Sequence, residues 1–158
     1  MLFRSLIGKT QGTWLAAVSS NVISQNRAAS ASAFSLVIPL QIPGARSALQ
    51  GSKIISVEVY YKIATAEATA FTAPEVAKIT LPATGSAPSG IALACTMDAL
   101  HGTQDRRIEI DDHSMLATLN TPVFLDADYA YYLTFSITPA SATLFTLFGA
   151  KINYELRL

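Results

Sequence analysis

The most constraining feature of this 158-residue sequence is a two-residue alternation of side-chain character in several separate segments. In the clearest case, residues 129–138, large apolar or aromatic side chains occupy every odd position. Residues 57–63 and 152–158 repeat the pattern. Successive side chains of a β-strand point to opposite faces of its sheet, so this period predicts half-buried strands.

Shorter strands are predicted where apolar runs lie between turn residues, at 34–40, 76–81, 91–97, 107–110 and 115–119. About eight strands at this spacing predict an all-β fold, an antiparallel β-sandwich and more specifically a jelly roll. Residues 64–73 contain helix-favouring alanines, but their threonines and Pro74 favour a strand or a loop. Gly149 interrupts the last alternation, where a bulge could switch the face that looks inward.

Residues 1–33 differ from the rest because they are rich in small polar side chains and have no sustained period. We expect an extended N-terminal arm with short strand pieces, followed by a β-sandwich domain at 34–158. The chain has five basic residues and no acidic one before Glu58. The arm could dock on the domain itself or on a neighbouring subunit, and its candidate contact residues are Arg4, Lys9, Trp14 and Arg27.

Composition excludes several classes of protein. Charged residues make up 14% of the chain and hydrophobic residues 51%, which excludes disorder as the main state. The formal net charge is zero, which argues against a specific nucleic-acid partner. No apolar run approaches the roughly 20 residues of a membrane span, so no membrane association is expected. Cys95 is the only cysteine, which rules out an internal disulfide and suggests a buried, inert thiol.

Seven of the eleven acidic residues fall within 31 positions, and these are Asp98, Asp105, Glu109, Asp111, Asp112, Asp126 and Asp128. Solvated turns, with ion pairs to Arg106 and Arg107, explain them better than a Ca²⁺ site, because no D-x-D-x-D-G spacing is present. His101 and His113 lack the further ligands that zinc needs. We therefore expect no metal and no cofactor.

The segment 111–114 has the residue types of a hydrolase triad, but neighbours in a strand point to opposite faces. No nucleophile elbow or phosphate-binding loop occurs, so an enzyme is not expected. Tyr60 and Tyr132 fall on the outward phase of their strands, which makes them candidates for ligand or subunit contact. Exposed aromatic rings of this kind could also stack on sugars.

Several short segments within residues 50–158 resemble segments of small β-rich virion structural proteins of tailed bacteriophages. They are the segments 54–61 (IISVEVYY), 111–115 (DDHSM), 121–129 (TPVFLDADY) and the ending 149–158 (GAKINYELRL). The resemblance implies a capsid decoration or minor capsid subunit, located in the virion and present in repeated copies. Its implied partners are the major capsid protein or other virion subunits, and a homo-oligomer, with a trimer favoured. The alternative is a carbohydrate-binding β-sandwich module of a virion appendage or tail.

Overall fold

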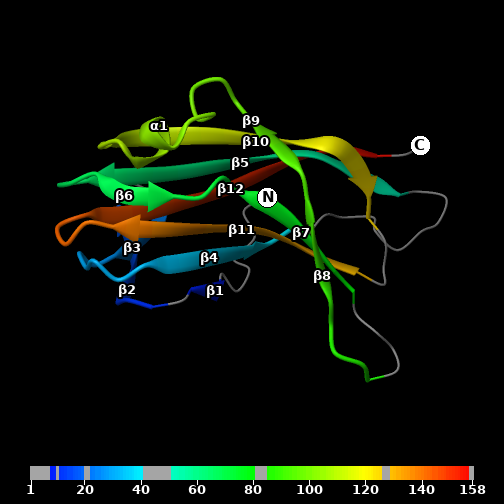
Figure 1. The fold of residues 1–158 in the computed structure, drawn as a ribbon, viewed down its shortest axis with the longest axis horizontal. Helices are drawn as coiled ribbons and strands as arrows, with labels where there is room; N and C mark the ends of the chain where they lie inside the picture. The colour runs from blue at the N-terminus through cyan, green and yellow to red at the C-terminus, as the bar shows by residue number, and fades with distance from the viewer. Residues whose placement is uncertain are drawn as a thin grey trace.

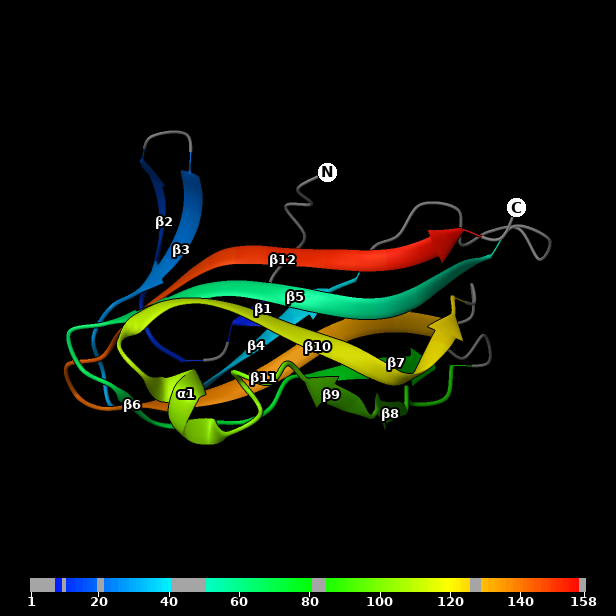
Figure 2. The same ribbon diagram turned by 90° about the horizontal axis from the view of Figure 1, so that it is seen from above.

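The computed structural model describes residues 8–9, 11–19, 22–40, 51–80, 85–125 and 129–156. These residues form two six-stranded sheets, and every strand pairing among them is antiparallel. The two sheets lie one above the other as a sandwich (Figures 1 and 2). The predicted all-β antiparallel sandwich is therefore confirmed.

The first sheet has the strand order β1-β4-β11-β7-β8, and β6 also pairs with β11. Its long central strand is β11, flanked by β4 and β7. Its strands are β1 (Gly8–Lys9), β4 (Phe34–Pro39), β6 (Ala68–Phe71), β7 (Glu75–Thr80), β8 (Gly90–Leu93) and β11 (Tyr129–Pro139).

The second sheet has the strand order β2-β3-β12-β5-β10-β9. Its three longest strands, β12, β5 and β10, are neighbours at its centre. Its strands are β2 (Trp14–Ser19), β3 (Val22–Arg27), β5 (Ser52–Ala64), β9 (Cys95–Met97), β10 (Asp111–Phe124) and β12 (Leu144–Leu156).

The core lies between the sheets, where the inward residues of the alternating strands meet. In β11, Tyr131, Leu133, Phe135 and Ile137 are at most 5% exposed, as the two-residue period predicts. In β5 and β10 the same alternation buries Tyr61 and Met115 completely. Because hydrophobic burial is the main driving force for folding, these inward faces hold the two layers together.

The described residues contain twelve strands, more than the eight or so that periodicity suggested. Beyond the predicted strands, β2 and β3 lie in the segment where short strand pieces were expected. β1 and β6 have only two and four residues, too few for an alternation to stand out. The predicted strand 91–97 is divided at Ala94, with β8 in the first sheet and β9 in the second. This segment therefore crosses from one layer to the other.

The predicted strand at 107–110 is wrong, because its first two residues belong to the short helix α1 (Gln104–Ile108). The cause is tertiary: Arg107 points inward and donates to the carbonyl oxygens of Phe71 and His101. The strand or loop favoured at 64–73 is confirmed as β6. Among the described residues no helix is long and apolar enough to cross a membrane.

The bulge predicted at Gly149 is confirmed by a register shift in the β12–β5 pairing between Leu147 and Gly149. Gly149 has φ 148°, a backbone conformation that favours glycine. Before the bulge Phe145 and Leu147 are buried, and after it Ala150 and Ile152 pack on the core. The inward face has thus moved from odd to even positions within one strand.

Candidate interaction surface

Strands β2 and β3 form a hairpin whose pairing runs from Trp14–Arg27 at its base to Ser19–Val22 near its tip. Only the base half of β3 joins the second sheet, where Gln25 to Arg27 pair with Leu147 to Phe145 of β12. Beyond that point the hairpin stands away from the body of the sandwich (Figure 2). The segment predicted as an arm therefore contains a hairpin that shares a sheet with the domain.

The bulge in β12 coincides with the place where the hairpin leaves the sheet. The last β12 residue paired with β3 is Leu147, and the register shift against β5 begins there. A bulge bends its strand and increases the local twist. The bulge therefore lies at the point where β3 and β12 separate.

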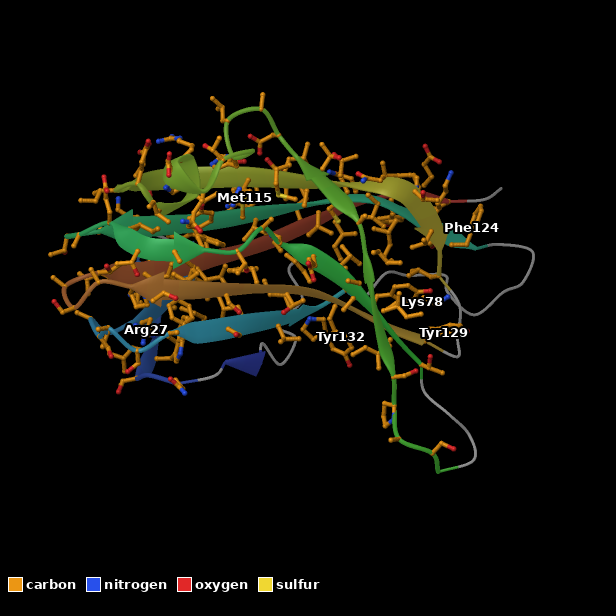
Figure 3. The ribbon with its side chains drawn as sticks, in the orientation of Figure 1. Arg27, Lys78, Met115, Phe124, Tyr129 and Tyr132 are labelled. Atoms are coloured by element: carbon orange, nitrogen blue, oxygen red, sulfur yellow. The ribbon has the colours of Figure 1, made fainter. Side chains whose placement is uncertain are left out.

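Arg27 fixes the base of the hairpin from inside the protein (Figure 3). Its side chain is 1% exposed and its guanidinium lies over the Phe34 ring, 4.5 Å from the ring centroid. It donates to the carbonyl oxygens of Ser30 at 3.1 Å and Ser32 at 2.7 Å. Burial lowers the pKa of Arg27, but the guanidinium stays charged because its pKa starts so high.

Trp14 anchors the other strand of the hairpin. Its ring packs edge-on against Phe34 and Phe145, with centroids 5.4 and 6.3 Å apart. Both proposed contact residues, Trp14 and Arg27, therefore attach the hairpin to the core, and Arg27 is enclosed by its own chain. Arg27, which the sequence analysis proposed as a contact for a partner, instead forms hydrogen bonds within its own chain.

The outer part of the hairpin exposes apolar side chains. Leu15 is 63% exposed, Val18 71% and Val22 49%. From Gln11 to Asn26 the sequence contains no charged residue. Exposed apolar surface without charge, on an element that stands away from the body, is typical of a protein–protein contact. The sequence predicted a contact in this region but not that Leu15, Val18 and Val22 would provide its surface.

The other predicted contact residues do not join this surface. Arg4 and the side chain of Lys9 lie outside the described residues, although the backbone of Lys9 pairs with Leu36 in the first sheet. Tyr60 is on β5 of the second sheet, whereas Tyr132 is on β11 of the first, between Pro39 and Ala77. The two tyrosines are half-buried and belong to different layers, so they do not form one sugar-binding platform.

Tyr60 belongs to a small polar cluster on the outer face of the second sheet. The Glu58 carboxylate accepts a hydrogen bond from Ser114 and pairs with Lys151 at 3.6 Å. Hydrogen bonds from Ser114 and Tyr60 lower the pKa of Glu58, and the same contact with Glu58 raises the pKa of Tyr60. This cluster explains the outward polar positions of β5, β10 and β12 as cross-strand pairs.

A second polar group, buried beside α1, connects the two histidines. The Asp98 carboxylate contacts Nδ1 of His101 at 2.9 Å, and Nε2 of His101 lies 3.2 Å from Nδ1 of His113. Nε2 of His113 in turn lies 3.1 Å from the Glu109 carbonyl oxygen. Both rings are at most 4% exposed, and His113 stacks on Tyr61 with centroids 4.5 Å apart. The adjacency in sequence of 111–114 did not reveal this chain of contacts.

The three contacts of this histidine pair need three protons, since a carboxylate and a carbonyl only accept. Two neutral imidazole rings carry only two N–H protons. If both rings are neutral and donate to Asp98 and Glu109, the contact between the two rings has no proton. A third proton would bring a positive charge into a buried region, close to Arg106 and Arg107. Burial, aided by the charge of Arg106 and by His101, lowers the pKa of His113. These contacts connect the segment before β10 to His113 of β10, and both rings are enclosed by the protein.

Arg106 neutralises part of the acidic region by ion pairs with Glu109 and with Asp111 at 2.9 Å. Lys62 pairs with Asp112 at 3.2 Å. Arg107, predicted to do the same, is instead buried and bound to backbone carbonyls. Asp126 and Asp128 lie outside the described residues. In the part of the chain that the structure describes, no cluster of three or more potential ligands could hold a metal ion.

Cys95 is only half-buried, and burial raises the pKa of its thiol, which keeps the reactive thiolate scarce at neutral pH. Comparison with known proteins adds no further assignment, because the chain matches no protein-family model and no curated protein. The conclusions about function therefore rest on the sequence and on the geometry described above.

Proposed function

We propose that this chain is a structural virion protein, a capsid decoration or minor capsid subunit that stabilises the shell through protein–protein contacts. The observation that carries the proposal is the outer part of the β2–β3 hairpin, which stands away from the body, has no charged residue and exposes Leu15, Val18 and Val22. The fold supplies a rigid two-layered body, and the hairpin supplies a surface that is unfavourable in water but favourable against another protein.

The winding of the strands supports a jelly roll as the finer architecture. Eight of the strands form nested pairs, in which each pair encloses the next along the chain. In chain order these strands are β3, β4, β5, β7, β8, β10, β11 and β12. The first of these strands pairs with the last, β3 with β12, and the second pairs with the seventh, β4 with β11. The third and sixth, β5 and β10, and the fourth and fifth, β7 and β8, complete the set. A long hairpin rolled into two sheets has this nesting, which is the jelly-roll arrangement used by many viral capsid domains.

The absence of a solvent-accessible reactive cluster in the described residues supports a structural role over catalysis. The histidine pair is enclosed, and the ion pairs of Arg106 and Lys62 occupy the carboxylates of Glu109, Asp111 and Asp112. We propose the major capsid protein or other virion subunits as partners. A homo-oligomer in the virion completes the proposal.

The proposal is tested by following the tagged chain during growth of the virus that encodes it. The wild-type chain should sediment with assembled particles, and Val18→Lys should shift most of it into the soluble fraction. Ile91→Lys is the matched control, because Ile91 is an exposed apolar residue on β8, which ends the other sheet. Purified particles that contain none of the wild-type chain would overturn the proposed function.

A further inference from the structure

Among the described strands, β2 has the longest sheet edge that lacks charged residues and proline, the features that usually prevent an edge from pairing with another chain. β2 ends its sheet and has six residues, with neither a charged residue nor a proline. The strands that end the sheets elsewhere, β1, β8 and β9, have two, four and three residues. Natural proteins shorten or charge their edge strands to prevent unwanted pairing, so an unprotected edge indicates an edge that is used.

The hydrogen-bond pattern of the hairpin shows which backbone groups the edge presents. The Thr13 carbonyl accepts from the Ala28 amide at 3.0 Å, which makes Thr13 and Ala28 a hydrogen-bonded pair. Alternation along an antiparallel ladder then directs the N–H and C=O groups of Ala16 and Val18 outward, away from β3. These groups can pair with another strand.

The chemistry of the edge selects the strand that would cover it. A strand with charged side chains would lose hydration at this apolar contact without gaining an opposite charge. The identical strand of a second copy brings no charge, and the formal net charge of zero means that two copies do not repel each other. Antiparallel pairing of a strand with itself also needs no second surface, because a two-fold axis makes the contact self-complementary.

We propose that β2 pairs with β2 of a second copy, antiparallel and about a two-fold axis through Ala16. In this register Trp14 lies opposite Val18 of the second copy, and Leu15 lies opposite its Ala17. Leu15 and Val18 point to opposite faces of β2, so each exposed side chain gains an apolar neighbour of the second copy on its own face. The small Ala16 side chains meet at the axis. This inference names the partner of the hairpin surface and so rests on the proposed function.

The test is disulfide trapping in the full chain with Cys95 replaced by serine. Ala16→Cys would face its own copy across a hydrogen-bonded pair, with Cα atoms about 5.5 Å apart, inside the disulfide range of about 4.4–6.8 Å. We expect mild oxidation at micromolar concentration to give a covalent dimer. The control is Ile91→Cys in the same background, on the exposed β8 edge. Cross-linking of Ala16→Cys no faster than that of Ile91→Cys would overturn the proposal.

Val18→Lys in the Ala16→Cys background gives a second readout. Val18 is 71% exposed, so the substitution leaves the fold intact, which circular dichroism checks. It should reduce the yield of covalent dimer at least tenfold, because two lysines would face the apolar contact; an unchanged yield contradicts self-pairing. If Ala16→Cys does not cross-link but Val18→Lys still removes the chain from particles, the self-pairing fails while the proposed function stands.

Discussion

Arg27 is a buried cation whose described acceptors are carbonyl oxygens rather than a carboxylate. Gly12 closes the space above it, since a Cβ at residue 12 would lie 2.7 Å from Nε of Arg27. The close approach is possible only for glycine, which also tolerates the φ of 98° at this position. Gly12 and Arg27 therefore contribute to the attachment of the hairpin together with Trp14 and the β3–β12 pairing.

Gly12→Ala should lower the free energy of unfolding more than Gly85→Ala does. Both glycines have positive φ, so both substitutions carry a backbone cost of about 1 kcal/mol. Only Gly12 contacts Arg27, and nothing described lies within 4 Å of a Cβ at Gly85. Overpacking should add about 1–3 kcal/mol at Gly12, measured by urea denaturation. Equal losses for the two variants would show that the contact with Arg27 is unimportant.

His113 should make the protein less stable as the solution becomes mildly acidic. Its pKa is lowered in the folded protein, mainly by burial, so the unfolded chain binds the proton more readily. Stability from the neutral ring is fully present above the unfolded pKa of about 6.5. It is lost as the pH falls from there through the folded pKa. Urea midpoints measured between pH 7.5 and 5 should fall for the wild type. The same series for His113→Gln should be flatter, and parallel slopes would contradict this role of His113.

At the scale of elements, strand β12 turns odd-numbered residues toward the core before Gly149 and even-numbered residues after it. The bulge at Gly149 moves the buried positions from Leu147 to Ala150 and Ile152, and β3 stays paired only on the first side of it. The change of inward face in β12 and the departure of the hairpin thus occur at the same place in the strand.

Gly149→Ala should destabilise the protein by about 1–3 kcal/mol, because the φ of 148° strains a residue with a Cβ. Gly90→Ala is the matched control in a strand: its φ is not in the positive range, and the nearest atom to an added Cβ is 3.7 Å away. Thermal unfolding of the two variants measures the difference. A Gly149→Ala protein as stable as Gly90→Ala would mean that the bulge accepts ordinary residues.

The sequence predicted most of the elements because alternation is a local property. Strands with one buried face, such as β5 and β11, carry that property along their length. Helix α1 was missed because Arg107 is held by Phe71 and His101, contacts that depend on distant segments. The break at Ala94 was missed for the same reason: each half of the apolar run 91–97 is covered by a different sheet.

At the scale of the whole molecule, self-association should be insensitive to salt. The proposed contact involves no charged side chain, and the formal net charge is zero. Screening at about 1 M NaCl removes contributions from exposed charges but leaves apolar contacts in place. The mass in solution, measured by light scattering, should be the same at 0.1 M and 1 M NaCl. Dissociation at high salt would contradict an apolar interface.

The candidate surface was only partly predictable, because position within the fold decides what a residue can contact. The sequence singled out the first 33 residues as a region for partners, with Arg4, Lys9, Trp14 and Arg27 as its candidate contact residues. The structure instead assigns Trp14 and Arg27 to attachment and leaves Leu15, Val18 and Val22 exposed. Nothing local in the sequence distinguishes an apolar strand that packs inward from one that projects.

In the proposed β2–β2 pair, the projection of the hairpin also determines how the two copies can be oriented. A contact confined to two short strands holds the sandwich bodies at a distance, so their relative tilt is set by the twist of a narrow ribbon rather than by a broad, rigid seam. Copies linked in this way can follow a surface whose curvature changes from place to place, as it does between the flat faces and the corners of a closed shell.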